Sequence, residues 1–143
     1  MKKLLPLLLL ILIGCSELET YKSYYGNGQL LQEVTWKDNK EHGPYKTYYE
    51  NGQLKQEGTF NNGEYDGLSK SYYENGQLRQ ESTYNNGELD GPLKNYHENG
   101  QPWNELTLKD GKEHGPWKYY NENGRLELEE TYKDGELIDS KEY

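Results

Sequence analysis

The sequence is short of cysteine and of aliphatic residues. Cys15 is the only cysteine among 143 residues, so the chain cannot form an internal disulfide. Hydrophobic residues make up only 31% of the chain, and many of them fall within residues 1–14. The rest relies on fifteen tyrosines and has few Leu, Ile or Val residues, a composition too poor in aliphatic side chains for a compact multilayer core.

Basic residues are also scarce. Without the two lysines of residues 1–14, 14 basic residues stand against 25 acidic ones, a net charge of −11. Nucleic acid binding depends on cationic contacts with phosphate, so this balance argues against a nucleic acid partner. It argues equally against electrostatic docking on anionic lipid.

The sequence lacks the familiar signatures of catalysis. It contains no Ser-His-Asp order, no cysteine nucleophile, no phosphate-binding loop and no dinucleotide fingerprint. The connecting segments 61–67, 85–91 and 109–115 carry oxygen ligands and glycine, but not at the spacing of a calcium loop. We therefore expect a protein that is not an enzyme and holds no metal or cofactor.

The first fourteen residues differ from everything that follows. Lys2 and Lys3 precede an apolar run of about ten residues and then Gly14, which is the pattern of a secretory signal peptide. The run is too short to span a bilayer comfortably as a helix. Residues 1–14 are therefore predicted to direct export.

The segment 12–15, Leu-Ile-Gly-Cys, resembles the lipobox of bacterial lipoproteins. That resemblance implies cleavage before Cys15 and multiple acylation of this cysteine, and several acyl chains hold a protein firmly to a membrane. Residues 15–20 would then form the lipidated residue and a short tether. We expect a lipid-anchored protein of the cell envelope, in either the inner or the outer membrane.

From Tyr21 to the C-terminus the sequence repeats every 24 residues. Five copies keep Asn-Gly, tyrosine, lysine and glutamate in one register, which indicates a repeat array. The lysine column consists of Lys22, Lys46, Lys70, Lys94 and Lys118, and the glutamate column of Glu33, Glu57, Glu81, Glu105 and Glu129. Residues 21–143 are therefore predicted to form five tandem repeats.

Each copy reads as two short strands. The runs 44–50 and 53–60 flank Asn51-Gly52, and Asn-Gly between such runs predicts a hairpin with a two-residue turn. Segments such as 61–67 predict looser turns between hairpins. A lone hairpin is marginal in water, so the copies must stack. The expected fold is all-β: an elongated, single-layer antiparallel meander, about 50 Å long at about 4.8 Å per strand.

The two-residue turn also predicts the pairing register. It places Glu50 opposite Gln53, Tyr48 opposite Lys55 and Lys46 opposite Glu57, so that every copy sets a lysine against a glutamate on one face. Opposite charges across an antiparallel pair stabilise by about 0.2–1 kcal/mol and fix the register. The other face is predicted to carry the following residues: Tyr49, Leu54, Phe60, Tyr73, Leu78 and Tyr84.

The phrase "YYENGQLKQEGTFNNGEYDG" resembles the bacterial variant of the MORN repeat, in which an aromatic pair, a turn glycine and a later "DG-P-x-K-x-Y" segment recur. The resemblance covers about 120 residues and implies the same repeated hairpin architecture. Similar repeats define proteins labelled YwqK-family antitoxins, which implies neutralising a toxin by binding it. Eukaryotic MORN arrays are linked to acidic lipids and to scaffolding, and the acidic composition here departs from lipid binding.

Histidines and glutamates give weak candidates for chemistry. His42 and His114 lie three repeats apart, about 30 Å along the array, so they cannot share a metal. Glutamates of neighbouring copies stand about 10 Å apart, outside the window for paired glycosidase carboxylates. Both residue types are better explained as solvated turn and surface positions.

The remaining candidate site is the tyrosine column on the lysine–glutamate face. Tyrosine is enriched in recognition surfaces, but the same rings can simply cover the sheet. The leading hypothesis is a membrane-anchored interaction or scaffold module that binds a protein. The alternatives are a toxin-neutralising antitoxin or immunity protein, and binding of surface polysaccharide. The candidate partner-binding residues are Tyr24, Tyr48, Tyr72, Tyr96 and Tyr120.

Overall fold

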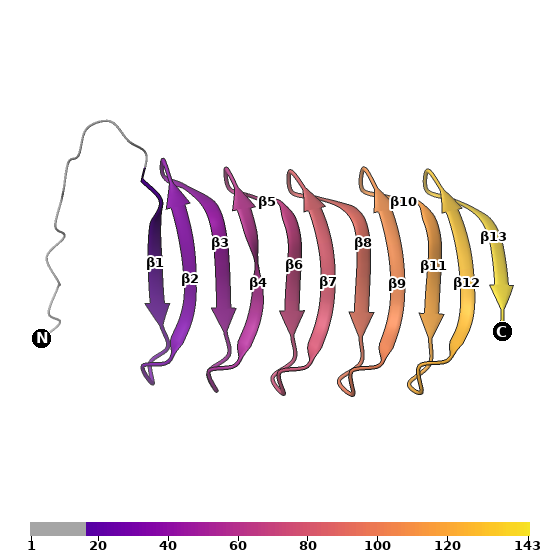
Figure 1. Cartoon of the computed structure of the whole chain (residues 1–143), viewed down its shortest axis with the longest axis horizontal. Helices are drawn as coiled ribbons and strands as arrows, with labels where there is room; N and C mark the ends of the chain where they lie inside the picture. The colour runs from indigo at the N-terminus through magenta and orange to yellow at the C-terminus, as the bar shows by residue number, and fades with distance from the viewer. Residues whose placement is uncertain (1–16) are drawn as a thin grey trace, which may run out of the picture.

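The computed structural model describes residues 17–143, which form one open antiparallel sheet of thirteen strands (Figure 1). No helix long and apolar enough to cross a membrane occurs in this part of the chain. The predicted signal peptide and Cys15 lie outside the described residues, so both stay predictions. The strands are β1 (Glu19–Tyr24), β2 (Leu30–Lys37), β3 (Lys40–Tyr48), β4 (Leu54–Asn61), β5 (Glu64–Tyr65), β6 (Gly67–Tyr72), β7 (Leu78–Asn85), β8 (Glu88–Tyr96), β9 (Pro102–Lys109), β10 (Lys112–Glu113), β11 (Gly115–Tyr120), β12 (Leu126–Lys133) and β13 (Glu136–Glu142).

The strands follow one another across the sheet in chain order, as Figure 1 shows. The main path runs through eleven strands, and the short β5 and β10 pair with β4 and β9 at one end. Ten inter-strand steps of about 4.8 Å give a sheet about 48 Å wide. The predicted all-β meander of five hairpin repeats is therefore confirmed.

The tight two-residue hairpin turn lies between repeats, not inside them. Asn61 pairs with Glu64, and the two residues between them have positive φ, 53° at Asn62 and 92° at Gly63. Positive φ at both central positions defines a type I′ turn. The looser turn predicted for this segment is thus wrong. The same geometry recurs at 38–39, 86–87, 110–111 and 134–135.

The turn within each repeat is longer than the Asn-Gly pair predicts. Tyr49 N–H donates to Gln53 O at 2.8 Å and Gly52 N–H donates to Tyr49 O at 2.9 Å, which leaves residues 50–52 as a three-residue loop. Within this loop only Gly52 has a positive φ, 85°. This is a type I turn closed by a left-handed glycine, so the predicted Glu50–Gln53 pair is wrong.

A β-bulge restores the register that this turn shifts. Tyr48 pairs with Leu54, not with Lys55 as predicted, and the next pair is Thr47 with Gln56. Lys55 is therefore skipped. The longer loop moves the pairing by one residue and the bulge moves it back, so the predicted pairing of Lys46 with Glu57 is confirmed.

The sheet has two distinct faces. Directly opposite residues of an antiparallel pair share a face, and we call the face of Lys46 and Glu57 the charged face and the reverse the aromatic face. Leu54 lies opposite Tyr48, and Leu78 opposite Tyr72, so both leucines belong to the charged face. Their predicted place on the other face is wrong, because the bulge reverses the alternation locally.

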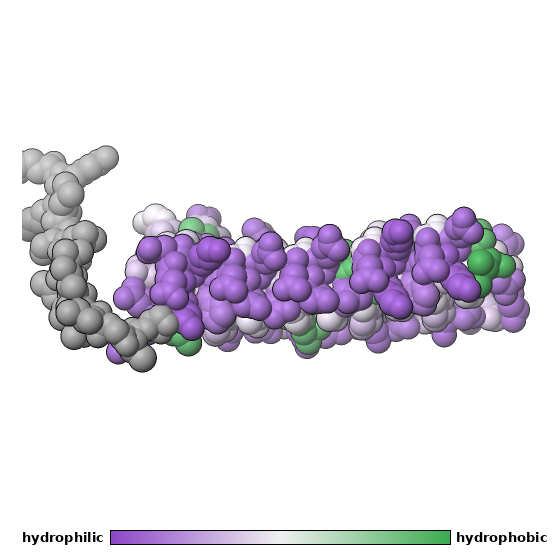
Figure 2. Space-filling model, turned by 90° about the horizontal axis from the view of Figure 1, so that it is seen from above, coloured by the Kyte–Doolittle hydropathy of each residue, from purple (hydrophilic) through white to green (hydrophobic). Residues whose placement is uncertain are grey.

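The hydrophobic core is thin and lies on the aromatic face. Within residues 17–143, the buried hydrophobic side chains are Val34 and Tyr45. Tyr45 and Tyr65 both pack against Phe60, with ring centroids at 4.7 and 4.6 Å, and Tyr84 continues the cluster 5.2 Å from Tyr65. Figure 2 shows the result, a narrow slab with a largely hydrophilic surface. Within residues 17–143 no second layer covers the sheet, so contacts between neighbouring strands stabilise the array.

Candidate interaction surface

One unbroken row of alternating charges crosses the charged face. Each glutamate pairs directly with a lysine on both neighbouring strands, and the row runs from the first strand of the described sheet to the last. We call these residues the charged row: Lys22, Glu33, Lys46, Glu57, Lys70, Glu81, Lys94, Glu105, Lys118, Glu129 and Lys141. The predicted lysine–glutamate pairs lay within hairpins. The structure adds lysine–glutamate pairs between the adjacent strands of successive hairpins.

All five predicted lysine–glutamate ion pairs are present. The Nζ–O distance is shortest for Lys70–Glu81, 2.9 Å, and longest for Lys46–Glu57 and Lys118–Glu129, 4.0 Å each. The side chains remain a quarter to a half exposed, so each pair contributes only about 0.2–1 kcal/mol. Their regular spacing therefore serves register and surface character more than stability.

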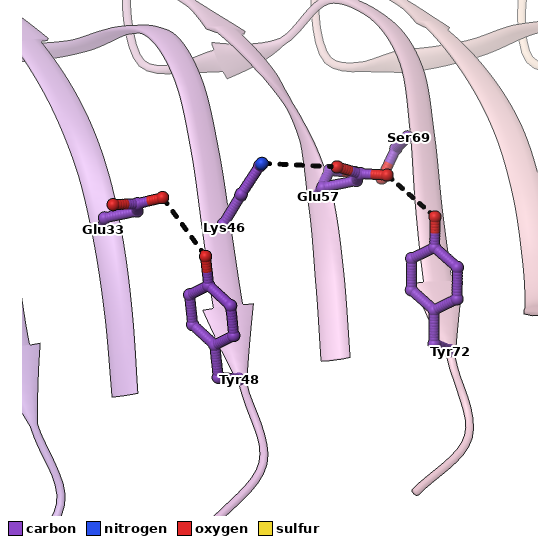
Figure 3. Close-up of polar contacts among 6 residues, drawn as sticks. All are labelled: Glu33, Lys46, Tyr48, Glu57, Ser69 and Tyr72. Carbon is purple, nitrogen blue, oxygen red and sulfur yellow. Dashed lines mark hydrogen bonds and ion pairs between the residues drawn. The ribbon is translucent and has the colours of Figure 1, made fainter. Parts of the chain in front are cut away.

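The tyrosine column belongs to the same face and is tied to the charged row. Tyr72 donates its hydroxyl to Glu57 Oε1 at 2.8 Å, and Tyr48 donates to Glu33 Oε1 at 3.2 Å (Figure 3). Tyr96 and Tyr120 repeat the contact at 3.4 Å each. Each glutamate belongs to the preceding repeat, so the tyrosines link one repeat to the next.

These contacts perturb the tyrosines. Burial, followed by the hydrogen bond to Glu57, raises the pKa of Tyr72 to about 12. The pKa values of Tyr48, Tyr96 and Tyr120 are also raised, first by burial and then by the facing glutamates. The column consequently presents neutral rings whose hydroxyl protons are already engaged.

Tyr24 is the exception in the column. It is 60% exposed, and no hydrogen bond to its hydroxyl is found among residues 17–143. Strand β1 is the first of the sheet in the described chain, so no preceding repeat offers a glutamate. The five predicted site residues thus share one face, but four of them are held by a glutamate and one is free of it.

A second ladder at the hairpin corners was not predicted. Tyr25, Tyr49 and Tyr73 each donate a hydroxyl to the backbone carbonyl of the next repeat, at 2.7 Å. The turn asparagines do the same with their side-chain amides, for example Asn51 to Glu74 O at 3.2 Å. The doubled tyrosine of the first three copies was the available signal, because neighbouring residues of a strand point to opposite faces and one ring serves each face.

The fourth copy interrupts this ladder. It has His97 where earlier copies have the second tyrosine, and the buried His97 Nε2 has no hydrogen-bond partner within residues 17–143. The Trp103 ring, which is 52% exposed, lies 6.2 Å from the imidazole. The tyrosine contacts of the ladder therefore link only the first four hairpin corners, whereas the asparagine contact continues to the fifth, with Asn99 donating to Glu122 O at 3.2 Å.

The described residues offer little for catalysis or metal binding. No group of three or more histidine, cysteine, aspartate or glutamate side chains is arranged to hold a metal within residues 17–143. His42 Nδ1 lies 3.4 Å from Asn62 N and His114 Nδ1 lies 3.6 Å from Asp134 Oδ1, so each histidine lies beside the type I′ turn of the next repeat. The column glutamates face lysine and tyrosine. What this arrangement can do chemically is bind through a regular surface.

Comparison with protein families agrees with this geometry. The model of the MORN repeat variant matches five segments of the chain, residues 20–38, 41–62, 65–86, 89–110 and 113–134. The matched segments begin in β1, β3, β5, β8 and β10, and each ends at the first residue of a type I′ turn. No match was found among curated proteins.

Proposed function

The chain belongs to the MORN repeat variant family, and from this premise we propose that it is a membrane-anchored, non-enzymatic module that docks another protein on its charged face. Five MORN repeats are consistent with a repeat protein-interaction module. The membrane anchor, the protein partner and the use of the charged face for docking are our proposal.

The observation that carries the proposal is the continuity of the charged face. Six lysines and five glutamates alternate over eleven strands, so the row is nearly neutral although the whole chain has a net charge of −9. Four tyrosine rings with engaged hydroxyls run beside it. Rigid aromatic rings next to ordered charges lose little conformational entropy on binding and favour a protein partner.

The proposal can be tested by co-purification from detergent-solubilised membranes. We expect Tyr48→Ala/Tyr96→Ala to lose a partner that the unmodified chain retains. The matched control is Tyr48→Phe/Tyr96→Phe, which removes the hydroxyl bonds to glutamate but keeps the rings, and should retain the partner. Circular dichroism would verify that both variants fold. Equal recovery of the partner by the folded alanine variant would refute docking on this face.

The anchor has its own test. Residues 1–14 and Cys15 lie outside the described residues, and the support for lipidation is their sequence pattern. Cys15→Ala should move the protein out of the mature membrane-bound form, seen as an uncleaved or released species in fractionated cells. A variant that is processed and retained in membranes like the unmodified chain would contradict the anchor.

The same co-purification separates the alternatives. A recovered partner whose expression alone arrests growth would make this a toxin-neutralising protein, which is one form of the proposed docking. Binding to a surface polysaccharide, with no protein partner recovered, would replace the proposal. Tyr72 and Tyr96 donate their hydroxyl protons to glutamate, so they offer such a sugar their ring faces and a hydroxyl oxygen as acceptor.

A further inference from the structure

The aromatic face of the first repeat contains a cavity. Its volume is about 620 Å³, within the range of ligand-binding sites. Tyr21, Val34 and Trp36 contribute its apolar lining, with Val34 buried and the Tyr21 and Trp36 rings edge to face at 6.2 Å. The cavity lies on the face opposite the charged row, so it is independent of the docking surface proposed above.

Two carboxylates flank the Trp36 indole on the same face. Trp36 pairs with Glu19 on β1 and with Glu41 on β3, the two strands on either side of β2. Directly paired residues project side by side from one face. Trp36 is therefore an aromatic side chain set between two glutamates.

The later repeats close this space with other residues. Phe60, which is one repeat on from Trp36, lies between Gly43 and Tyr65, and the Tyr65 ring stacks on it at 4.6 Å. Tyr84 lies between Gly67 and Leu89. At Trp36 the glycine position is taken by Glu19 and the covering position by Glu41. The first repeat thus differs from the second and third in having acidic neighbours in place of a glycine and an apolar cover.

The lining of the cavity is predominantly anionic. Four carboxylates, from Glu17, Glu19, Asp38 and Glu41, line it together with two lysines, Lys22 and Lys37. Lys22 is ion-paired with Glu33 on the charged face. None of the four carboxylates takes part in an ion pair within residues 17–143.

The raised pKa of Tyr21 agrees with the negative charge of the cavity lining. Its hydroxyl donates to Glu19, and this hydrogen bond, together with the charge of Glu19, raises the Tyr21 pKa. Tyr21 consequently stays protonated and leaves the second oxygen of Glu19 and the whole Glu41 carboxylate as acceptors. An anion would be repelled here, and an uncharged ligand would form no ion pair with these carboxylates.

We propose that this cavity binds an organic cation, an ammonium or guanidinium group, over the Trp36 ring and between the Glu19 and Glu41 carboxylates. An aromatic face attracts a cation that also has apolar surface, and an adjacent carboxylate adds an ion pair. A small inorganic cation gains less from the aromatic lining because it keeps its hydration shell. The same chemistry is found in a free quaternary amine and in a lysine or arginine side chain of a partner.

Tryptophan provides the readout. The full chain, labelled with ¹⁵N-tryptophan in a nonionic detergent, has three indole signals, from Trp36, Trp103 and Trp117. Titration with tetramethylammonium, and separately with a short arginine-containing peptide, should give a saturable shift of the Trp36 signal. Trp103, which is more than half exposed and distant in sequence, reports non-specific effects. Neopentyl alcohol, the uncharged analogue that serves as the neutral isostere, should not saturate the site at equal ionic strength.

Two double variants test the residues. Glu19→Gln/Glu41→Gln keeps the shape of the cavity and removes two charges, and should weaken binding about tenfold or more, the effect of about 1.4 kcal/mol. Glu64→Gln/Glu88→Gln makes the same change in net charge outside the cavity and should leave binding unchanged. Saturation by either cation supports the proposal, and the tighter one identifies the source. No saturation by either, equal binding of the neutral isostere, or equal loss in both variants would overturn it.

Discussion

Gly58 is a glycine within a strand because the Tyr45 ring lies too close to leave room for a side chain. A Cβ added at Gly58 would lie 2.8 Å from Tyr45 Cε1 and 3.3 Å from Ser69 Cβ. Tyr45 is only 3% exposed and its hydroxyl lies 3.1 Å from Ser69 Oγ, so the ring has no free direction in which to move. Gly58 therefore makes room for the largest buried ring of the aromatic face.

Gly58→Ala should lower the free energy of unfolding by about 1–3 kcal/mol, the usual cost of overpacking. Gly26→Ala is the control, because a Cβ there meets nothing within 4 Å and no positive φ is required; its effect should stay within about 0.5 kcal/mol. Urea unfolding followed by circular dichroism measures both. Equal effects of the two substitutions would show that the Tyr45 pocket can relax.

Buried tyrosines give the fold a defined dependence on alkaline pH. Burial raises the pKa of Tyr45 to about 12, from 10.0. The folded chain then keeps a proton that the unfolded chain loses between pH 10 and 12, so stability is complete below pH 10 and falls as pH rises toward 12. Tyr45→Phe should flatten this fall, and Tyr24→Phe, which changes an exposed ring, should not. An unchanged slope in Tyr45→Phe, measured by urea unfolding at each pH, would contradict the assignment.

At the scale of the hairpin, two asparagine–glycine turns of similar sequence have different geometries. Asn62 has a left-handed φ of 53°, a conformation that glycine adopts without cost. Asn51 instead accepts a hydrogen bond from Gln53 N at 2.9 Å and donates to Glu74 O at 3.2 Å. One asparagine supplies backbone conformation and the other supplies hydrogen bonds.

Glycine substitution should therefore separate them. Asn62→Gly is expected to change stability by less than about 0.5 kcal/mol, because relief of the left-handed φ offsets the added chain entropy. Asn51→Gly should cost about 1–2 kcal/mol, since two hydrogen bonds are lost and none is gained. Thermal unfolding of the two variants measures the difference. Similar losses would favour the two-residue turn at Asn51-Gly52 that the sequence suggests.

The turns also show where prediction from sequence ends. The 24-residue period, the strand content and the Lys46–Glu57 register follow from local pattern, and all are confirmed. Asn-Gly has the same propensity for a type I′ turn at 51–52 and at 62–63, so the sequence alone could not say which of the two forms that turn. A three-residue loop and a bulge at Lys55 cancel in register, so the Lys46–Glu57 pair does not reveal them.

For the candidate site, the sequence predicted the face on which the tyrosines lie but not the hydrogen bonds that they make. Placing Tyr48 and Tyr72 on the lysine–glutamate face needed only strand alternation. The bonds from these tyrosines to Glu33 and Glu57 join different repeats, so they depend on the stagger between hairpins, which no single copy encodes. The cavity beside Trp36 exists because Glu41 stands where Tyr65 covers the ring in the next repeat. Glu41 belongs to the neighbouring strand, so the sequence of the Trp36 strand alone does not predict the cavity.

Over the whole molecule, the array is nearly one-dimensional. Each strand of the main path pairs only with its neighbours, so stability is approximately a sum of repeat and interface contributions. The charged row runs through every interface between these strands. Strict alternation gives each glutamate two basic neighbours and each lysine between Lys46 and Lys118 two acidic ones, which penalises any strand that slips by one residue.

Charge reversal in the middle of the row tests this role. Lys70 lies between Glu57 and Glu81, so Lys70→Glu would set three glutamates side by side and should cost about 1 kcal/mol at low salt. Arg79→Glu is the matched control, because it makes the same change in net charge at an exposed position outside the row.

Salt distinguishes the row from a general increase in negative charge. At 1 M salt the Debye length falls to about 3 Å, shorter than the spacing of about 4.8 Å between strands, so most of the Lys70→Glu loss should disappear. The Arg79→Glu loss should be small at both salt concentrations. If the two variants lose equal stability in urea unfolding at low salt, the row contributes no more than any surface charge, and its regularity would then belong to partner binding alone.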